Sequence, residues 1–187
     1  MAITAPHIVG GLLEVASPDA RILEVGCGDK GLREVLPGTY VGLDLPDSSY
    51  LDEPPDLAGS AEDIPAEDQT FDLVFGVAVF VLITDVDRAF RECLRVLRPG
   101  GHLLVFDYQK AVGEQLAVSD PERHRRAWDS AELCERIRAA GFVDVRDRSS
   151  LVDTADGPSL ALLARRRIRR AMGAVGTWLI VEARRPS

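Results

Sequence analysis

The sequence predicts an α/β fold built on a doubly wound, mostly parallel sheet of seven strands. Short apolar runs alternate along the chain with stretches of helical periodicity, which is the pattern of such folds. The first run, 21-RILEV-25, enters a glycine-rich turn, as a buried parallel strand does. The chain has 187 residues, of which 46% are hydrophobic and 28% charged, so one domain with a full core is expected.

The predicted elements follow one another in a regular order. The strands are expected at 21–25, 40–45, 56–60, 71–80, 102–108, 142–148 and 177–183. The helices are expected at 5–16, 31–36, 85–97 and 130–140. Proline and glycine end these elements, and the prolines of 46–56 exclude a helix there. The last two strands are expected to pair antiparallel, so that the C-terminal end of the chain supplies an antiparallel edge strand.

Local signals set the helix boundaries. Thr84 and Ser130 are predicted to cap the third and fourth helices, because hydroxyl groups accept hydrogen bonds from the first helical amides. Gly141 is predicted to end the fourth helix. Residues 98–101, Arg-Pro-Gly-Gly, are predicted to form the turn between the third helix and the fifth strand.

Composition excludes several classes of protein. The net charge of −8 argues against binding nucleic acid, which needs Lys and Arg to replace phosphate counterions. No apolar run approaches the roughly 20 residues of a membrane helix, and no basic segment precedes a signal-like stretch. Three scattered cysteines fit reduced thiols, and no metal site is predicted. We therefore expect a cytoplasmic protein, either a monomer or a homodimer.

The chain contains a nucleoside-binding pattern. Gly26, Gly28 and Gly31 spell G-x-G-x-x-G after the first strand, and Asp44 ends the second strand. Glycines let a ligand approach the backbone, and an acid at Asp44 can accept two hydrogen bonds from a ribose diol. NAD and S-adenosylmethionine both carry such a ribose, so these residues leave both cofactors open.

Two observations favour S-adenosylmethionine. Glu24 precedes the first glycine by two residues, and an acid there suits a sulfonium and an ammonium better than a diphosphate. Tyr108 and Lys110 are spaced wrongly for the Y-x-x-x-K pair of many dehydrogenases.

The wider pattern resembles class I S-adenosylmethionine-dependent methyltransferases of the group that modifies small molecules. The matching pieces occur in the order ILEVGCG, GLDL, GSAEDIP, TFDLVF, FRECLRVLRPGG and AELCERIRAAGF, over roughly residues 20–148. The resemblance implies a Rossmann-like fold that binds S-adenosylmethionine and releases S-adenosylhomocysteine. It also implies methyl transfer to an O, N or C atom of a small molecule, with secondary metabolism as one setting.

The resemblance also implies a set of cofactor-binding residues. Asp44 would hold the ribose hydroxyls and Leu45 would pack on the adenine, while Gly76 and Val77 would line the region of the sulfonium. The complete set is Glu24, Gly26, Cys27, Gly28, Asp44, Leu45, Ser60, Ala61, Glu62, Gly76 and Val77.

The sequence departs from the family pattern at two positions. The third glycine of the usual G-x-G-x-G falls on Lys30, and the adenine-binding Asp falls on Ser60. These departures keep a second hypothesis open, in which the chain binds the cofactor or its product as a non-catalytic partner or regulatory subunit. An NAD-dependent oxidoreductase is the third.

Candidates for catalysis lie after the fifth strand. They are Asp107, Tyr108 and His124, with Asp129 as a further acid. A histidine titrates near neutral pH and could act as a base, although His124 also fits a surface position in a charged segment.

Arg165, Arg166, Arg167, Arg169 and Arg170 form a basic run. It fits the solvated face of an amphipathic helix, or a patch that recruits an anionic substrate or carrier protein. Residues 1–187 are expected to form one methyltransferase domain. It would comprise an N-terminal helix (1–20), a cofactor-binding core (21–109), and a C-terminal part (110–187) with the substrate side and edge strands.

Overall fold

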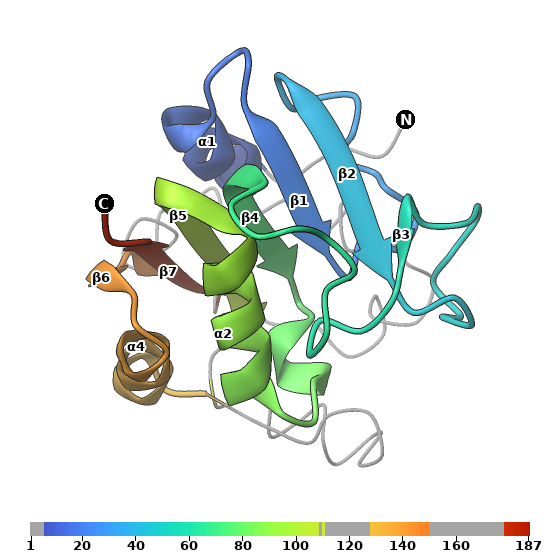
Figure 1. The fold of residues 1–187 in the computed structure, drawn as a ribbon. Coiled ribbons are helices and arrows are strands. Elements are labelled where there is room, and N and C mark those ends of the chain that lie inside the picture. Colours follow the sequence, from blue (N-terminus) through green and yellow to red (C-terminus); the bar gives the residue numbers. More distant parts are fainter. Residues whose placement is uncertain (1–5, 109, 111–127, 150–177) are drawn as a thin grey trace.

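The computed structural model describes residues 6–108, 110, 128–149 and 178–187, and its centre is one seven-stranded sheet (Figure 1). The strand order is β3-β2-β1-β4-β5-β7-β6. The strands are β1 (Arg21–Val25), β2 (Thr39–Asp44), β3 (Leu57–Ala58), β4 (Phe71–Val77), β5 (Leu97–Tyr108), β6 (Val143–Asp147) and β7 (Trp178–Arg184). Strand β1 lies next to both β2 and β4, so the chain reverses its winding direction there. The predicted fold class is confirmed.

The two final strands pair antiparallel, as predicted. Strand β7 runs antiparallel to β5 on one side and to β6 on the other, whereas β1 to β5 are mutually parallel. Strand β6 is therefore outermost, and β7 lies one position inside the edge. The burial of the two strands explains this order, because Leu179, Val181 and Ala183 of β7 are buried while most of β6 is exposed.

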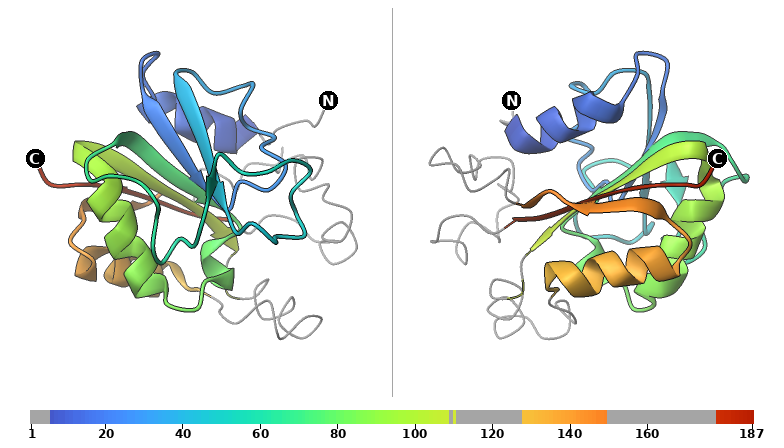
Figure 2. Two further views of the ribbon diagram at one scale, coloured as in Figure 1. Left: turned by 45° about the vertical axis from the view of Figure 1, so that its right-hand side comes forward. Right: turned by 90° about the vertical axis from the view of Figure 1, so that its left-hand side faces the viewer.

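Helices cover both faces of the sheet. Helix α1 (Pro6–Val15) packs on one face, and α2 (Val86–Val96) and α4 (Ser130–Ala139) pack on the other (Figure 2). Ile8 and Leu12 bury the inner side of α1, and Gly11 brings that helix close to Phe106 of β5. The glycine that weakens α1 as a helix residue thus permits its close packing.

Sequence signals misplaced two helix caps by one residue each. Asp85, and not Thr84, caps α2 by accepting a hydrogen bond from the Arg88 amide at 3.0 Å. Asp129, and not Ser130, caps α4 by accepting from the Glu132 amide at 2.7 Å. A carboxylate competes well for this position because it also complements the helix dipole. Gly141, with φ of +108°, follows α4 as predicted.

The helix predicted at 31–36 does not form. Residues 31–36 make successive turns, with hydrogen bonds from Arg33 to Lys30 and from Val35 to Leu32 that span three residues. Six residues before Pro37 are too few to offset the cost of nucleating an α-helix.

The predicted turn at 98–101 is a bulge inside β5. Pairing between β4 and β5 shifts between Phe71 and Leu73, so that residues 98–101 of β5 lie opposite Asp72 alone. Arg98 forms an ion pair with Asp72 at 2.8 Å, and Asp72 also accepts from the Arg21 amide. Asp72 thus has a structural role at the far end of the sheet.

Among the described residues, no helix is both long and apolar enough to cross a bilayer. The division of 1–187 into a helix, a cofactor core and a substrate side stays a prediction.

Gly38 offers a test of the fold. Its φ is +76°, and an added Cβ would lie 2.1 Å from the backbone oxygen of Ala20, which accepts from the Thr39 amide. We expect Gly38→Ala to lower the free energy of unfolding by about 2 kcal/mol or more, because both strain and overlap oppose it.

Gly10→Ala is the matched control. Nothing lies within 4 Å of a Cβ at Gly10, which is inside α1, so alanine there should stabilise by about 0.5–1 kcal/mol. Denaturant unfolding measures both variants, and equal stabilities would contradict the structure at Gly38.

Candidate functional site

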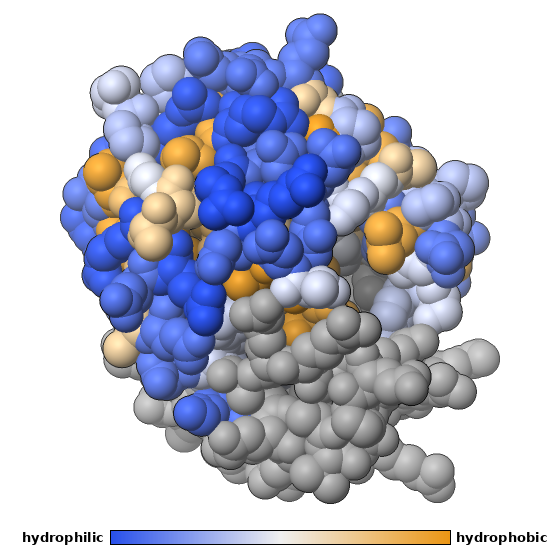
Figure 3. Space-filling view, turned by 60° about the horizontal axis from the view of Figure 1, so that its bottom comes forward, coloured by the Kyte–Doolittle hydropathy of each residue, from blue (hydrophilic) through white to orange (hydrophobic). Residues whose placement is uncertain are grey.

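The carboxyl ends of the parallel strands meet at one edge of the sheet. Strand pairing brings Val25 of β1 level with Leu43 of β2 and Gly76 of β4. The molecule viewed towards this end shows apolar side chains at the surface among hydrophilic ones (Figure 3). Ligands of open α/β sheets bind at such an edge, where the winding direction changes.

A strained turn follows β1. Gly26 and Gly28 have φ of +69° and +49°, and Lys30 has φ of +53° although it carries a side chain. The amides of Gly26 and Cys27 donate to the Leu43 oxygen at 2.8 and 3.1 Å. The turn is therefore fastened to the end of β2.

This turn is poorly suited to a diphosphate. In the described stretch 26–44 no α-helix begins after the turn, so the helix N-terminus that binds a pyrophosphate is missing. Several of the amides that a phosphate would need are already donated to protein acceptors: that of Gly28 to Asp44, that of Lys30 to the Cys27 oxygen and that of Gly31 to Asp29. The geometry favours the non-phosphate reading of the glycine pattern.

Asp44 and Leu45 stand where the second strand ends. One carboxylate oxygen of Asp44 accepts from the Gly28 amide and the other from the Leu45 amide, both at 2.8 Å. Each oxygen keeps a further lone pair for a ligand hydroxyl. The side chain of Leu45 is 50% exposed, which makes it one of the few large exposed apolar residues described.

Glu24 lies buried beneath the turn, with 5% of its surface exposed. The hydroxyl of Tyr40 on β2 donates a hydrogen bond to its carboxylate. Burial first, and then the charge of Glu24, raise the pKa of Tyr40 above its usual range. Tyr40 therefore remains a donor, and the pair keeps a carboxylate close under the turn.

The thiol of Cys27 faces the protein interior. Its sulfur lies so close to Gly42 that a Cβ there would approach it to 2.8 Å. Burial, followed by the carboxylates of Glu24 and Asp44, raises the pKa of Cys27 to about 12. The thiol thus stays protonated, and its sulfur donates to the backbone oxygen of Gly28 at 4.0 Å.

Gly26 and Gly76 accommodate the side chain of Val79. A Cβ at Gly26 would lie 2.4 Å from a Val79 methyl group, and one at Gly76 would lie 2.6 Å from the other. The segment after β4 thus rests on two glycines of neighbouring strands. Next to it, Val77 ends β4 half-buried and Ala78 takes φ of +54°. Strained residues of this kind gather at functional edges.

Ser60, Ala61 and Glu62 form the turn after β3. The Ser60 hydroxyl accepts from the Glu62 amide at 3.1 Å, and Ala61 is half-buried against the core. The Glu62 carboxylate accepts from the Asp85 amide at 2.8 Å and so ties this turn to the start of α2. The Gly59 amide donates to the backbone oxygen of Asp44 at 3.0 Å, which places the turn beside the end of β2.

The candidates for catalysis are placed unevenly. Asp107 is fully buried and accepts from the amides of Val81, at 3.0 Å, and Tyr108, at 2.9 Å. Val81 belongs to the 3₁₀ helix η1 (Phe80–Leu82), so Asp107 joins β5 to the segment after β4. Tyr108 is 2% exposed. His124 and the arginine run 165–170 lie outside the described residues, and Asp129 caps α4. A catalytic role for Asp107, Tyr108 or His124 stays a prediction.

Three contributors to this edge were missed by sequence reasoning. Tyr40, Val79 and Asp56 all act through tertiary contacts with residues of β1, of the glycine turn or of β4. No sequence signal identified them, because the pairing of β1 with β2 that brings Tyr40 beside Glu24 is a feature of the tertiary structure.

Comparisons with known proteins find similarity to methyltransferases. Residues 23–105 match the family described as a methyltransferase domain. A malonyl-[acyl-carrier protein] O-methyltransferase from Methylococcus capsulatus is 28% identical over 74% of this chain and 58% of its own length. A fatty-acid O-methyltransferase from Mycolicibacterium smegmatis is 38% identical over 73% of this chain and 52% of its own. The chain thus spans about half the length of these relatives.

The fold is also that of a solved structure. The phosphoethanolamine N-methyltransferase 2 of Haemonchus contortus, in complex with S-adenosylhomocysteine, superimposes with a TM-score of 0.66 at 16% identity. The match covers 97% of this chain and 53% of that one, and it supports the fold alone.

Asp107 leads to a prediction about pH. Burial raises its pKa from 3.8 to about 7, against the opposing effect of the hydrogen bonds from Tyr108, Val81 and Trp128. The folded protein therefore holds a proton that the unfolded chain has lost between about pH 4 and pH 7. The stability that this carboxyl contributes is complete below pH 4 and is lost as the pH rises through 7.

We expect the stability of the wild type relative to Asp107→Asn to fall between pH 5 and pH 8. Asn has one acceptor oxygen fewer than Asp at every pH, so the absolute difference in stability is not informative. Only the change of that difference with pH reports the titration of Asp107. Urea unfolding at both pH values measures it. Parallel pH profiles for the two proteins would mean that Asp107 does not titrate in this range.

Proposed function

Because the chain carries a class I S-adenosylmethionine-dependent methyltransferase domain, we propose that it transfers a methyl group from S-adenosylmethionine to a small-molecule acceptor. The observation that supports this most directly is the arrangement at the end of β2. Asp44 stands against the glycine turn, and the exposed apolar Leu45 follows it. Asp44 would accept hydrogen bonds from a ribose diol, and Leu45 would offer an apolar surface to the adenine ring beside it.

The residues present fit S-adenosylmethionine. Glu24 and Asp44 are acids on either side of the turn, and their charge suits a ligand that carries a sulfonium and an ammonium. The turn itself lacks the helix N-terminus that would favour NAD. When bound, the cofactor supplies a methyl group already activated towards a nucleophile.

The protein then has two tasks in the reaction. Glu24, Asp44 and Leu45 would hold and orient the cofactor, and the segment after β4 would border the acceptor. Positioning two reactants in line is worth roughly 7–11 kcal/mol of the barrier. The hydrogen bond that the Val81 amide of η1 donates to Asp107 would keep that segment in place.

The relatives guide the choice of acceptor. One is named for malonyl-[acyl-carrier protein] and the other for fatty acids, and both names specify O-methylation. We therefore propose an acyl carboxylate as the acceptor of this chain. A carboxylate is already deprotonated at neutral pH, so its methylation needs no general base.

A carrier protein is the partner that we propose for such an acyl group. The basic run 165–170 would provide the surface that its anionic phosphopantetheine arm approaches. Support for this comes from the relative named for an acyl-carrier protein substrate and from the charge of the run.

Ligand binding and methyl transfer test the proposal together. Calorimetric titration should show S-adenosylhomocysteine binding in the micromolar range and no comparable binding of NADH. Labelled S-adenosylmethionine should then form methyl esters with free fatty acids or with malonyl-carrier protein. Binding without transfer to either acceptor class would favour a regulatory subunit, and preferential binding of NADH would reject the methyltransferase.

Asp44 offers a test of the cofactor site. We expect Asp44→Asn to weaken S-adenosylhomocysteine binding about tenfold or more, because the ribose loses a charged acceptor. Asp47→Asn is the control, because Asp47 is exposed and the substitution removes the same charge three residues further along the chain. Calorimetry on both variants measures the difference, and similar affinities would show that charge alone, and not the position of Asp44, matters.

A further inference from the structure

Lys30 takes a conformation that costs energy. Its φ of +53° is one that glycine adopts freely, whereas other residues lose roughly 1–2 kcal/mol there. It occupies this position in the turn that binds Asp44 through Gly28. A lysine at a position suited to glycine implies that its side chain has a compensating role.

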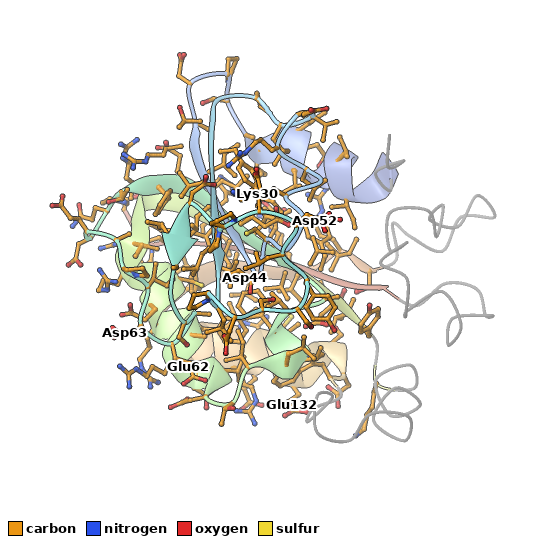
Figure 4. The ribbon with its side chains drawn as sticks, turned by 90° about the vertical axis from the view of Figure 1, so that its right-hand side faces the viewer. Lys30, Asp44, Asp52, Glu62, Asp63 and Glu132 are labelled. Carbon is orange, nitrogen blue, oxygen red and sulfur yellow. The ribbon has the colours of Figure 1, made fainter. Side chains whose placement is uncertain are left out.

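The side chain of Lys30 is buried and fully engaged. Only 5% of it is exposed. Its ammonium donates to the Pro54 oxygen at 2.7 Å, lies 3.0 Å from the Glu53 carboxylate and reaches Asp56 at 3.4 Å. All three partners lie in the short stretch 53–56. Figure 4 labels Lys30 and Asp44 on this side of the molecule. A lysine directed at a cofactor would be aimed elsewhere.

Asp56 connects this lysine to the sheet. Its carboxylate accepts from the Gly42 amide of β2 at 2.7 Å and from the Arg33 guanidinium at 2.6 Å. Burial alone would raise the pKa of Asp56, but Arg33, Gly42 and Lys30 together hold it below its usual value. The carboxylate therefore stays charged and fixes the end of the stretch against β2.

Residues 45–56 thus form a strap between two carboxylates. Asp44 precedes the strap and binds the glycine turn through Gly28, and Asp56 ends it and binds the turn through Lys30. Within the strap, the turn-type hydrogen bonds from Ser48 to Leu45 and from Leu51 to Ser48 are local. The strap contains neither helix nor strand, so turn and side-chain contacts hold it in position, and those of Lys30 with Glu53, Pro54 and Asp56 are among them.

We propose that Lys30 is a positioning residue that fixes the strap against the glycine turn and thereby pre-organises the adenosine side of the cofactor site. This inference rests on the proposed function. Leu45, the exposed residue expected to meet the adenine, begins the strap. Without the lysine, ligand binding would have to order the strap, and affinity would fall by that entropic cost.

Two substitutions at Lys30 test this. Lys30→Gly removes the whole side chain and introduces a residue that adopts φ of +53° without strain. Lys30→Met removes the ammonium but keeps most of the buried aliphatic part of the side chain. We expect both to weaken S-adenosylhomocysteine binding about tenfold in calorimetry. In the ligand-free variants, the amides of 45–56 should exchange with deuterium faster than in the wild type. The amides of β1 and β4 should be unchanged.

Gln69→Gly is the matched control. Gln69 is also a non-glycine residue at positive φ, +54°, but it is exposed and its amide bonds to the Arg95 oxygen near the start of β4. Glycine there relieves the same strain without touching the strap, so affinity and exchange at 45–56 should stay at wild-type values. If both Lys30 variants unfold, Glu53→Gln provides a second test, because it removes the charge that pairs with Lys30. The side chain of Glu53 is 58% exposed, and the substitution should shift both readouts in the same direction by a smaller factor, about twofold.

The two readouts must change together. Wild-type affinity in a variant whose strap exchanges faster would overturn the proposal, as would weaker binding with an unaltered strap. A wild type that binds no S-adenosylhomocysteine would instead reject the proposed function. The exchange experiment on the ligand-free variants would still show whether Lys30 holds the strap.

Discussion

The hydrogen bond from the Gly28 amide to the Asp44 carboxylate organises this protein's site. It joins the turn after β1 to the end of β2, and it forms because the two strands pair in parallel with Val25 level with Leu43. A carboxylate held in this way stays at the edge of the sheet with lone pairs to spare. Leu45, Glu24 and the strap 45–56 all lie next to this contact.

The site combines strain with burial on a rigid sheet. Lys30 and Ala78 hold positive φ at the ends of β1 and β4, and Val79 fills the space left by Gly26 and Gly76. Such conformations persist only where the surrounding structure enforces them, and the buried strands β1, β4 and β5 provide that constraint. Asp107 extends the same principle to the segment after β4, where this buried carboxyl accepts a hydrogen bond from the Val81 amide of η1.

Much of the fold could be predicted because it depends on local patterns. The apolar runs, the helical periodicity of 85–97 and the glycine at 141 correspond to β strands, α2 and the end of α4 with small shifts. Predictions failed where a competing group outweighed a local signal, or where the predicted element was too short to form. Asp85 and Asp129 capped helices in place of neighbouring hydroxyls, and the stretch 31–36 was too short for a helix. At the site, Glu24 before the glycines and Asp44 at the end of the second strand could be located in advance, whereas the roles of Glu24, Asp44 and Leu45 towards a cofactor stay predictions.

The sequence by itself determined the fold class and the identity of the residues around the glycine turn, because both follow from spacing along the chain. Only the tertiary structure decided what those residues contact. Lys30 faces the stretch 53–56 and not the ligand side, Tyr40 meets Glu24, and Val79 rests on two glycines. These contacts join residues from different strands and loops, often more than 14 positions apart, and their geometry is set by strand register and burial, which spacing along one chain does not encode.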